Sequence, residues 1–358
     1  MPLIGPEFAV KTVLKQIVKG FINQRRQEGL LEGVKRLGYA ARALPFLHQH
    51  RELFALTLYR RFLVERGGIN GLVHFSLPHY LSSEFSLRQR ADAALLHYRY
   101  ESDRHNAEYH RAVYCTRGIG RGITLWATCV DDVEYTIRLH ASNCDYGRCE
   151  GALAVSLFVG SICITNIRYS WVDSRVFGVN LGVIPFVTCN QSVDRQSADL
   201  QFFRNAFPQN APSYFCFAAL RGIAEAHGVT GIAAIRSDCQ FSFRDSLSPG
   251  FRNSYCEFWE SLGGVELDHQ AFLIPVALVA PPFAALKSNH RGRAHRRRRN
   301  WLEISKSALE SVSRHRIELL DYAQVRLGIE APTQLPAEAG PAVRVSDGSA
   351  VGPALCID

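Results

Sequence analysis

The sequence predicts an α+β protein in which helices precede and flank a central antiparallel or mixed sheet. Two changes of residue pattern indicate this class. Before residue 110 apolar residues recur at helical spacing, whereas from Gly122 short runs rich in β-branched and aromatic residues are separated by Asp, Asn and Gly. After residue 211 helical and strand-like segments alternate, which predicts that helices cover the faces of one sheet.

The first 66 residues read as a basic helical region with breaks at Gly29, Gly38 and Pro45. An amphipathic basic helix can lie on a membrane surface or pack its apolar face on the domain, and both interpretations stay open. A further helix is expected at 83–110, capped by Ser82 or Ser83. Its acidic residues are expected to form a charged, solvated face: Glu101, Asp103 and Glu108.

The predicted strands form a meander followed by alternating helices and strands. The strand-like runs are 122–130, 133–141, 151–160, 161–172 and 176–189. Gly160-Ser161 is expected to form a tight hairpin turn. The later elements are a helix at 213–227 ended by Gly228, a strand at 230–236, a helix at 253–262 ended by Gly263 and Gly264, and a strand at 269–278.

A long helix is expected at 294–327, followed by a disordered tail rich in Pro, Ala and Gly. The expected organisation is therefore a basic helical region at 1–66, an α+β domain with a C-terminal arginine-rich helix at 67–327, and a tail at 328–358.

Positive charge is concentrated in two segments. Residues 1–66 hold twelve Lys and Arg against five Glu, and residues 287–299 hold seven Lys and Arg with no acid, in a chain of net charge +8. Such segments favour an anionic partner: a small anionic ligand, a nucleic acid or an anionic membrane surface. The candidate anion-binding residues are Lys287, Arg291, Arg293, Arg296, Arg297, Arg298 and Arg299. Arginine favours bidentate pairing with phosphate or carboxylate. The same run could instead neutralise acids of the fold such as Glu257, Glu260 and Asp268.

Several classes of protein find no support in the sequence. None of the ten cysteines forms a C-x-x-C pair, and no metal site is expected. No run of 18 uncharged apolar residues and no signal peptide is visible, so we expect a cytoplasmic protein with reduced cysteines.

Two motifs resemble acyl-CoA-dependent N-acyltransferases of the GNAT type. Residues 117–122 match their pyrophosphate loop R-x-x-G-x-G, but the segment that follows reads as a strand, so a glycine-rich turn is the main alternative. The elements at 211–276, ending in Phe258-Trp259-Glu260, resemble the second half of that fold. The resemblance implies acyl-CoA as a ligand, bound between the strand that ends near Cys189 and the strand that starts at Thr230. In that family a Tyr commonly protonates the departing thiolate, and here Trp259 stands in its place. Tyr255 and Cys256 are the nearest replacements and so the candidate catalytic residues.

The body of the chain resembles the VirK/YbjX family of bacterial proteins over roughly 40–320. The residues that carry the resemblance are Tyr255, Phe258, Trp259, Glu260, Leu262, Gly263, Gly264, Phe272, Pro275, Lys287, Ser288, Arg291, Arg296 to Arg299, Trp301 and Leu302. The resemblance implies a role in virulence, envelope remodelling, stress response or tolerance of antimicrobial peptides, without an assigned reaction. Two functions stay open: an acyltransferase or other protein that binds an acyl-CoA-like anion, and a non-enzymatic protein that binds nucleic acid or anionic lipid through 287–299.

Overall fold

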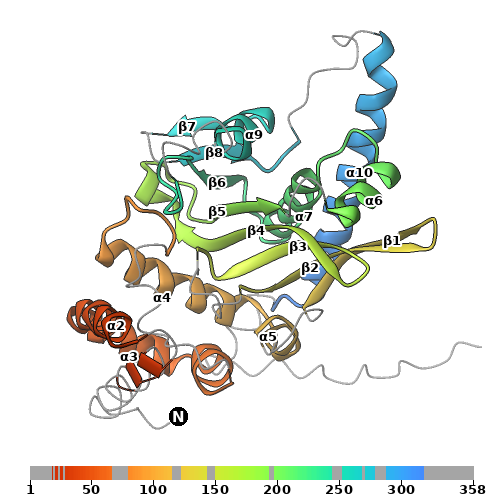
Figure 1. Ribbon diagram of the computed structural model, residues 1–358. Coiled ribbons are helices and arrows are strands. Elements are labelled where there is room, and N and C mark those ends of the chain that lie inside the picture. Colours follow the sequence, from red (N-terminus) through yellow and green to blue (C-terminus); the bar gives the residue numbers. More distant parts are fainter. Residues whose placement is uncertain are drawn as a thin grey trace, which may run out of the picture. The chain divides into compact units, whose positions relative to one another are not determined.

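The computed structural model describes residues 29–66, 80–114, 122–142, 150–192, 197–243, 252–267, 271–278 and 288–317, with a few single positions before residue 29. The chain separates into two compact units, 1–317 and 318–358, and the described residues belong to the first. This unit is a mixed α+β structure with helices on both sides of one sheet, as the sequence predicted (Figure 1). The predicted tail at 328–358 lies outside the described residues.

The described sheet has eight strands in the order β1-β2-β3-β4-β5-β6-β8-β7. Neighbouring strands are antiparallel except β5 and β6, which are parallel. The strands are β1 (Ile123–Val130), β2 (Val133–Ala141), β3 (Leu153–Val159), β4 (Ile162–Asp173), β5 (Val183–Ser192), β6 (Gly231–Ile235), β7 (Val265–Leu267) and β8 (Ala271–Pro275).

The predicted meander is confirmed over β1 to β5. β3 is buried at every position because helices cover both faces of the sheet there. Gly160 has φ 56° in the turn between β3 and β4, as predicted for a tight hairpin, and Asp131 and Asp132 take positive φ in the turn before β2. The first predicted part of β5, residues 176–182, instead holds the end of a 3₁₀ turn at Ser174–Phe177 and a loop. The short strand β7 was not predicted.

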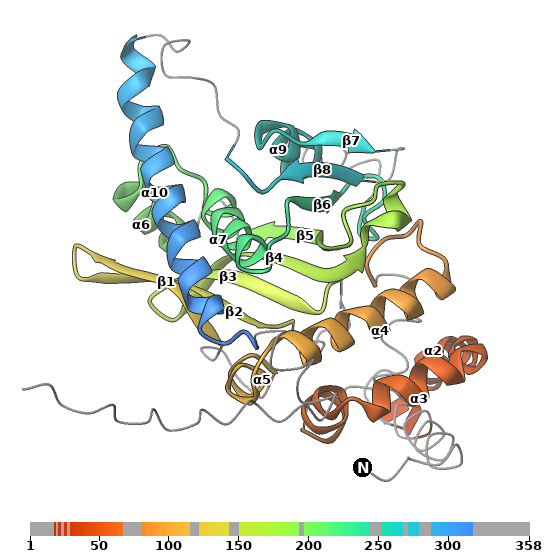
Figure 2. The ribbon, with the colours of Figure 1, turned by 180° about the vertical axis from the view of Figure 1, so that it is seen from behind.

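The helices of the described residues lie before, between and after the strands. They are α2 (Leu30–Ala43), α3 (Leu47–Ala55), a π-helical segment (Tyr59–Arg66), α4 (Leu87–Arg104), α5 (Ala107–Tyr114), α6 (Ala198–Ala206), α7 (Pro212–Ala226), α9 (Cys256–Ser261) and α10 (Ser288–Ser313). α6 was not predicted. α7 packs on the strands in the middle of the sheet and against α10, whereas α4 packs on β4 from the other side (Figures 1 and 2).

The helix expected at 83–110 is two helices, and its cap lies further along the chain. Ser86 caps α4 by accepting from the Gln89 N–H, and the Gln89 side chain accepts from the Ser86 N–H. Ser82 and Ser83 were therefore the wrong caps, because neither has a Gln or Glu three residues later to complete this pair. The helix ends at Arg104, where His105 becomes extended.

The arginine-rich helix is displaced from its predicted range. α10 begins at Ser288 and ends at Ser313, so the expected helix over 314–317 is wrong, and residues 318–327 lie outside the described part of the chain. Arg316 instead forms an antiparallel bridge with His105, in which the Asn106 N–H donates to His315 O and the Ile317 N–H donates to Arg104 O. These bonds tie the end of α10 to the end of α4.

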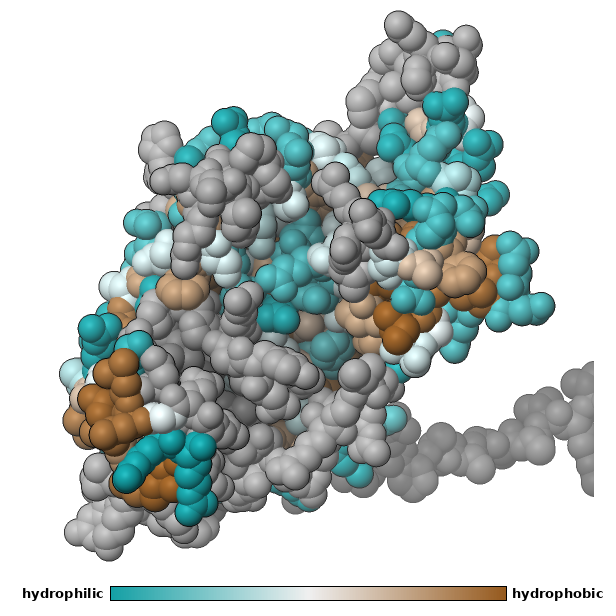
Figure 3. Space-filling model, viewed as in Figure 1, coloured by the Kyte–Doolittle hydropathy of each residue, from teal (hydrophilic) through white to brown (hydrophobic). Residues whose placement is uncertain are grey.

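The breaks expected in the N-terminal region are confirmed only in part. α2 begins after Gly29, which has φ 96°, and Pro45 lies in the short 3₁₀ turn that separates α2 from α3. Gly38 does not break α2. Apolar side chains gather on the surface over α2, brown at the lower left of Figure 3, and they are Leu30, Leu31, Val34, Leu37 and Leu44.

Candidate functional site

The two parallel strands share only a short contact, because β6 ends one residue after it while β5 runs on. β5 and β6 pair only at Phe186–Ala233 and Val187–Ala234, while β5 continues to Ser192 and β6 ends at Ile235. The chain returns from β5 to β6 through α6 and α7. Ligands of sheets with parallel strands commonly bind outside the carboxyl ends of those strands, so the end of this pair marks a candidate site.

A cavity of about 600 Å³ opens beside the end of β5. Its walls come from the end of β5, from α6, from the start of α7 and from the residues around the start of α9. The polar residues that line it include Asn190, Ser192, Arg204, Asn210, Ser213 and Ser254. We refer to it below as the β5 cavity.

The N-terminus of α7 faces this cavity without a side-chain cap. Pro212 occupies the first turn and has no N–H, Ala211 at the cap position offers no side-chain hydrogen bond, and the Tyr214 N–H donates to Ala211 O at 3.0 Å. The Asn210 Oδ1 atom is buried without a hydrogen-bond partner. A helix N-terminus holds partial positive charge, which suits an anion, whereas Asn210 Oδ1 is an acceptor and Glu257, which also lines the cavity, is acidic.

Asn190 fixes the three walls relative to one another. Its Nδ2 donates to Ser254 O at 2.8 Å, and its Oδ1 accepts from Ser213 Oγ at 2.8 Å. Its backbone N–H donates to the Tyr255 hydroxyl at 3.4 Å. The Asn190 side chain is therefore a rigid link between β5, α7 and the start of α9.

The two candidate catalytic residues lie at this end of the sheet in different environments. Tyr255 is 3% exposed, and burial raises the pKa of its phenol further above the ordinary value, helped by Cys189 and Glu150. Cys256 is partly exposed, and its Sγ lies 3.3 Å from Ser237 Oγ. Cys256 is thus the more exposed of the two side chains, and neither residue lines the β5 cavity. Trp259 is buried and donates from Nε1 to Ile235 O at 2.9 Å, so it anchors α9 to β6.

The arginine run occupies the first half of α10. Arg291, Arg293, Arg296 and Arg299 are exposed, Arg297 and Arg298 are partly buried, and Lys287 lies outside the described residues. No carboxylate of the described residues lies within ion-pair distance of Arg293, Arg296 or Arg299.

A stack of side chains connects the run to the β5 cavity. The Arg297 guanidinium carbon lies 5.6 Å from the centre of the Trp301 ring, and Trp301 stacks on Tyr214 with ring centres 5.0 Å apart. Tyr214 lines the cavity. The structure thus brings one arginine of the run into contact with the cavity wall through two aromatic rings.

A buried polar cluster around Glu101 was not predicted. The expectation of a solvated acidic face is wrong for Glu101, which is fully buried between α4 and β4. Its carboxylate accepts from Trp171 Nε1 at 2.6 Å and from the Tyr114 hydroxyl at 3.1 Å. Burial raises the pKa of Glu101 to about 7, although these donors oppose the shift. The sequence carries no local signal for this, because the partners are far away along the chain.

Two histidines beside Glu101 are held neutral by burial. Burial lowers the pKa of His105 to about 2 and that of His227 to about 3; nearby His and Arg charges add to the first shift, and Arg charges add to the second. His105 stacks on Tyr109 with ring centres 3.7 Å apart, and the Tyr100 hydroxyl lies 3.1 Å from His227 Nδ1. This is a packed core cluster that joins α4, α5, β4 and the end of α7.

The described residues hold neither a metal cluster nor a helix suited to a bilayer. They contain no group of three or more His, Cys, Asp or Glu side chains that could hold a metal ion. None of the helices described here combines the length and apolarity needed to cross a membrane.

The structure is an α+β fold with a cavity beside the end of β5, next to the parallel pair β5 and β6. The chain matches the family model described as "Protein of unknown function (DUF535)" over residues 71–311, and it belongs to that family. This family includes VirK/YbjX, so the resemblance is confirmed at the level of the family. The search of curated proteins and the search of solved structures each found no match.

Proposed function

We propose that this protein binds an acyl-CoA-like thioester in the β5 cavity. The observation that carries the proposal is that β6 ends one residue after its two pairs with β5, with the β5 cavity at the end of β5. The ligand's diphosphate would lie at the uncapped N-terminus of α7, where the partial positive charge of the helix suits an anion. Its acyl end would reach toward α9.

The topology around the cavity supports the likeness to acyltransferases. α7 follows the first parallel strand and precedes the second, and β8 lies between β6 and β7 in the sheet. The earlier R-x-x-G-x-G motif does not contribute, because the residues after Gly122 form strand β1 and offer no helix N-terminus. The proposed anion site is therefore the start of α7.

Calorimetric titration with CoA, acetyl-CoA and longer acyl-CoAs tests the proposal. Ser213→Asp places a negative charge at the start of α7, where it favours the helix but repels a phosphate. We expect it to weaken CoA binding at least about tenfold, as the loss of a charged hydrogen bond would. Ser213→Ala removes only the bond to Asn190, and Arg88→Gln, on the exposed side of α4, is the matched charge control. Binding that is absent in the wild type, or unchanged in Ser213→Asp, contradicts the proposal.

Acyl transfer is the reaction this site would support. The departing thiolate of CoA needs a proton, and Cys256 and Tyr255 are the nearest candidates at the end of β6. Release of free CoA thiol from acetyl-CoA in the presence of an amine acceptor would report the reaction. Loss of release in Cys256→Ser with binding retained would assign Cys256, and loss in Tyr255→Phe would assign Tyr255. Binding without release would make the protein a thioester-binding protein.

We propose that the protein acts in the bacterial cytoplasm in envelope remodelling, stress response or tolerance of antimicrobial peptides, as the VirK/YbjX resemblance implies. Acylation of an envelope component would connect such a role with the β5 cavity. A deletion strain with altered lipid acylation, restored by the wild type but not by Ser213→Asp, is the outcome we expect.

A second function is favoured by a separate observation. Arg293, Arg296 and Arg299 recur every three residues on α10, are exposed and lack an ion-pair partner among the described carboxylates. Like charges at this spacing destabilise a helix unless an anion binds them. A non-enzymatic protein would use this surface for nucleic acid or anionic lipid. Mobility-shift and vesicle-sedimentation assays on an Arg293, Arg296, Arg299→Gln variant separate this function from binding in the β5 cavity.

A further inference from the structure

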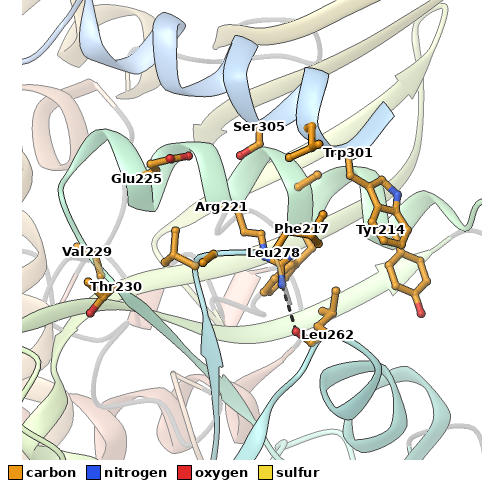
Figure 4. A pocket seen from close by; sticks show the side chains of 14 residues that line it. Tyr214, Phe217, Arg221, Glu225, Val229, Thr230, Leu262, Leu278, Trp301 and Ser305 are labelled. Atoms are coloured by element: carbon orange, nitrogen blue, oxygen red, sulfur yellow. Dashed lines mark hydrogen bonds between the residues drawn. The ribbon is translucent and has the colours of Figure 1, made fainter. Parts of the chain in front are cut away.

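A second cavity, of about 300 Å³, lies on the other side of Tyr214 between α7, α10 and the residues after β8. Figure 4 shows its wall: Phe217 and Arg221 from α7, Leu262 after α9, Leu278 after β8, and Trp301 and Ser305 from α10. Most of the wall is apolar. We refer to it as the α7–α10 cavity, and nothing in the proposed CoA-binding function uses it.

Arg221 is the buried charged side chain in this mostly apolar wall. It is 5% exposed, on a helix whose neighbouring residues, Phe215 to Ala224, are all buried. Its Nη2 donates to Leu262 O at 3.1 Å, and its guanidinium carbon lies 5.2 Å from the centre of the Phe217 ring. Its Nε is buried without an acceptor. The guanidinium is thus fixed in position while part of its donor capacity is unused.

The positive charge of Arg221 also lacks a counterion. No carboxylate of the described residues forms an ion pair with it. A buried charge without a partner is costly, and here burial lowers the pKa of Arg221 to about 10. Glu225, one turn further along α7, lines the same cavity but is exposed and outside ion-pair distance. An anion in the cavity would supply the missing partner.

We propose that the α7–α10 cavity binds a small carboxylate with an apolar body, such as a medium-chain acyl carboxylate, whose carboxylate pairs with Arg221. The volume of the cavity is at the lower limit of small-molecule pockets, so it suits a single short chain. The apolar wall would hold the hydrocarbon, and a guanidinium pairs with a planar carboxylate in bidentate geometry. A phosphate dianion would need more donors than this wall offers.

The first test compares octanoate with octanol on the full-length wild type by calorimetry. The two probes differ in charge and share the hydrocarbon. We expect octanoate to bind roughly tenfold to hundredfold more tightly, the range given by one charge-assisted hydrogen bond. Acetate should bind weakly because it leaves the apolar wall unfilled. Equal affinity for octanoate and octanol, or no binding of octanoate at millimolar concentration, would overturn the proposal. This comparison requires no variant.

The second test uses Arg221→Met. It should remove the preference for octanoate over octanol. Arg90→Met is the matched control, because Arg90 is also buried and donates to a backbone carbonyl, Ser82 O, but lines neither cavity. Glu225→Gln should leave octanoate binding equal or tighter, since it removes a like charge from the wall. Octanoate binding that survives Arg221→Met contradicts the inference.

The two cavities are distinguished by the same variants. Ser213→Asp should weaken CoA binding and leave octanoate binding unchanged, whereas Arg221→Met should do the reverse. If octanoate binding is lost in Ser213→Asp and kept in Arg221→Met, the carboxylate occupies the β5 cavity and the inference about Arg221 is wrong. Failure of CoA to bind would refute the proposed function alone.

Discussion

The ionisation of Glu101 should make the stability of this protein depend on pH in a direction opposite to that of its buried histidines. Glu101 is fully buried, and its carboxyl group accepts from Trp171 Nε1 and the Tyr114 hydroxyl. Replacing it by Gln keeps the shape and one acceptor oxygen but removes the titration. The comparison of wild type with Glu101→Gln therefore isolates this one group.

The size of the effect follows from the shift. The pKa of Glu101 is raised from 4.5 to about 7, and one pKa unit corresponds to about 1.4 kcal/mol, so the folded state loses on the order of 3 kcal/mol when Glu101 ionises. Because the folded pKa lies above the unfolded one, this stabilisation is fully present below pH 4.5 and is lost as the pH rises toward 7. Above that pH both states are ionised and the difference is constant.

The histidines act with the other sign. His105 and His227 have folded pKa values of about 2 and 3, below the ordinary 6.5. Their contribution is present above pH 6.5 and is lost as the pH falls toward these values. The pH dependence of the wild-type stability therefore combines contributions of both signs. The contribution of Glu101 is given by the difference in stability between the wild type and Glu101→Gln.

Urea unfolding at several pH values between 4.5 and 8 measures this difference. The stability of wild type minus that of Glu101→Gln should fall by about 3 kcal/mol across the window. Glu260→Gln, at an exposed position of α9, should show no such change. A difference that is constant with pH would refute the reasoning, because it would mean that Glu101 ionises with the same pKa in the folded and unfolded states.

The close approach of α7 to α10, the cap of α4 and the arginine run each carry a further prediction. Gly222→Ala should destabilise the protein by about 1–3 kcal/mol or more in urea unfolding, because a Cβ there would lie 2.0 Å from Ser305 O and would push α10 away from α7. Gly38→Ala is the control: a Cβ there would meet nothing within 4 Å, and the change should stabilise α2 slightly. Ser86→Ala should cost about 1 kcal/mol through loss of the α4 cap, and equal stability would show that the cap contributes nothing. Replacing Arg296 to Arg299 by Gln should flatten the salt dependence of duplex DNA binding by roughly 0.9 for each phosphate that the variant no longer neutralises, and an unchanged slope would exclude this surface as a polyanion site.

The sequence predicted the elements whose apolar pattern is local. The strands β1 to β4 and β6 and helix α7 were found because they are runs rich in apolar, β-branched or aromatic residues bounded by turn residues such as Gly, Asn and Asp. β7 was missed because it has three residues, and Val265 and Glu266 are both exposed. α6 was missed because it is short and lies in a polar stretch between Ser197 and Pro208. Both elements were missed because they are short and lack a clear apolar pattern along the sequence.

The candidate sites were predicted less completely because they depend on contacts between distant segments. The arginine run and the pair Tyr255 and Cys256 are visible as motifs, but the β5 cavity depends on where β6 stops relative to β5. Glu101 looks like a surface acid in a helix of mixed polarity, and only the position of Trp171 on β4 shows that it is buried. Spacing along one helix cannot reveal a partner on another element.

Arg221 is the one hidden feature for which the sequence held a signal. The segment FCFAALRGIA, residues 215–224, is apolar on every side of a helix, and such a helix is buried on all sides. A single arginine in its middle is then expected to be largely buried as well. Burial of a charge requires a counterion, so the segment alone poses the question of which anion Arg221 meets. No carboxylate of the described residues forms an ion pair with Arg221. In the proposal above, a bound carboxylate in the cavity beside the guanidinium would supply the counterion.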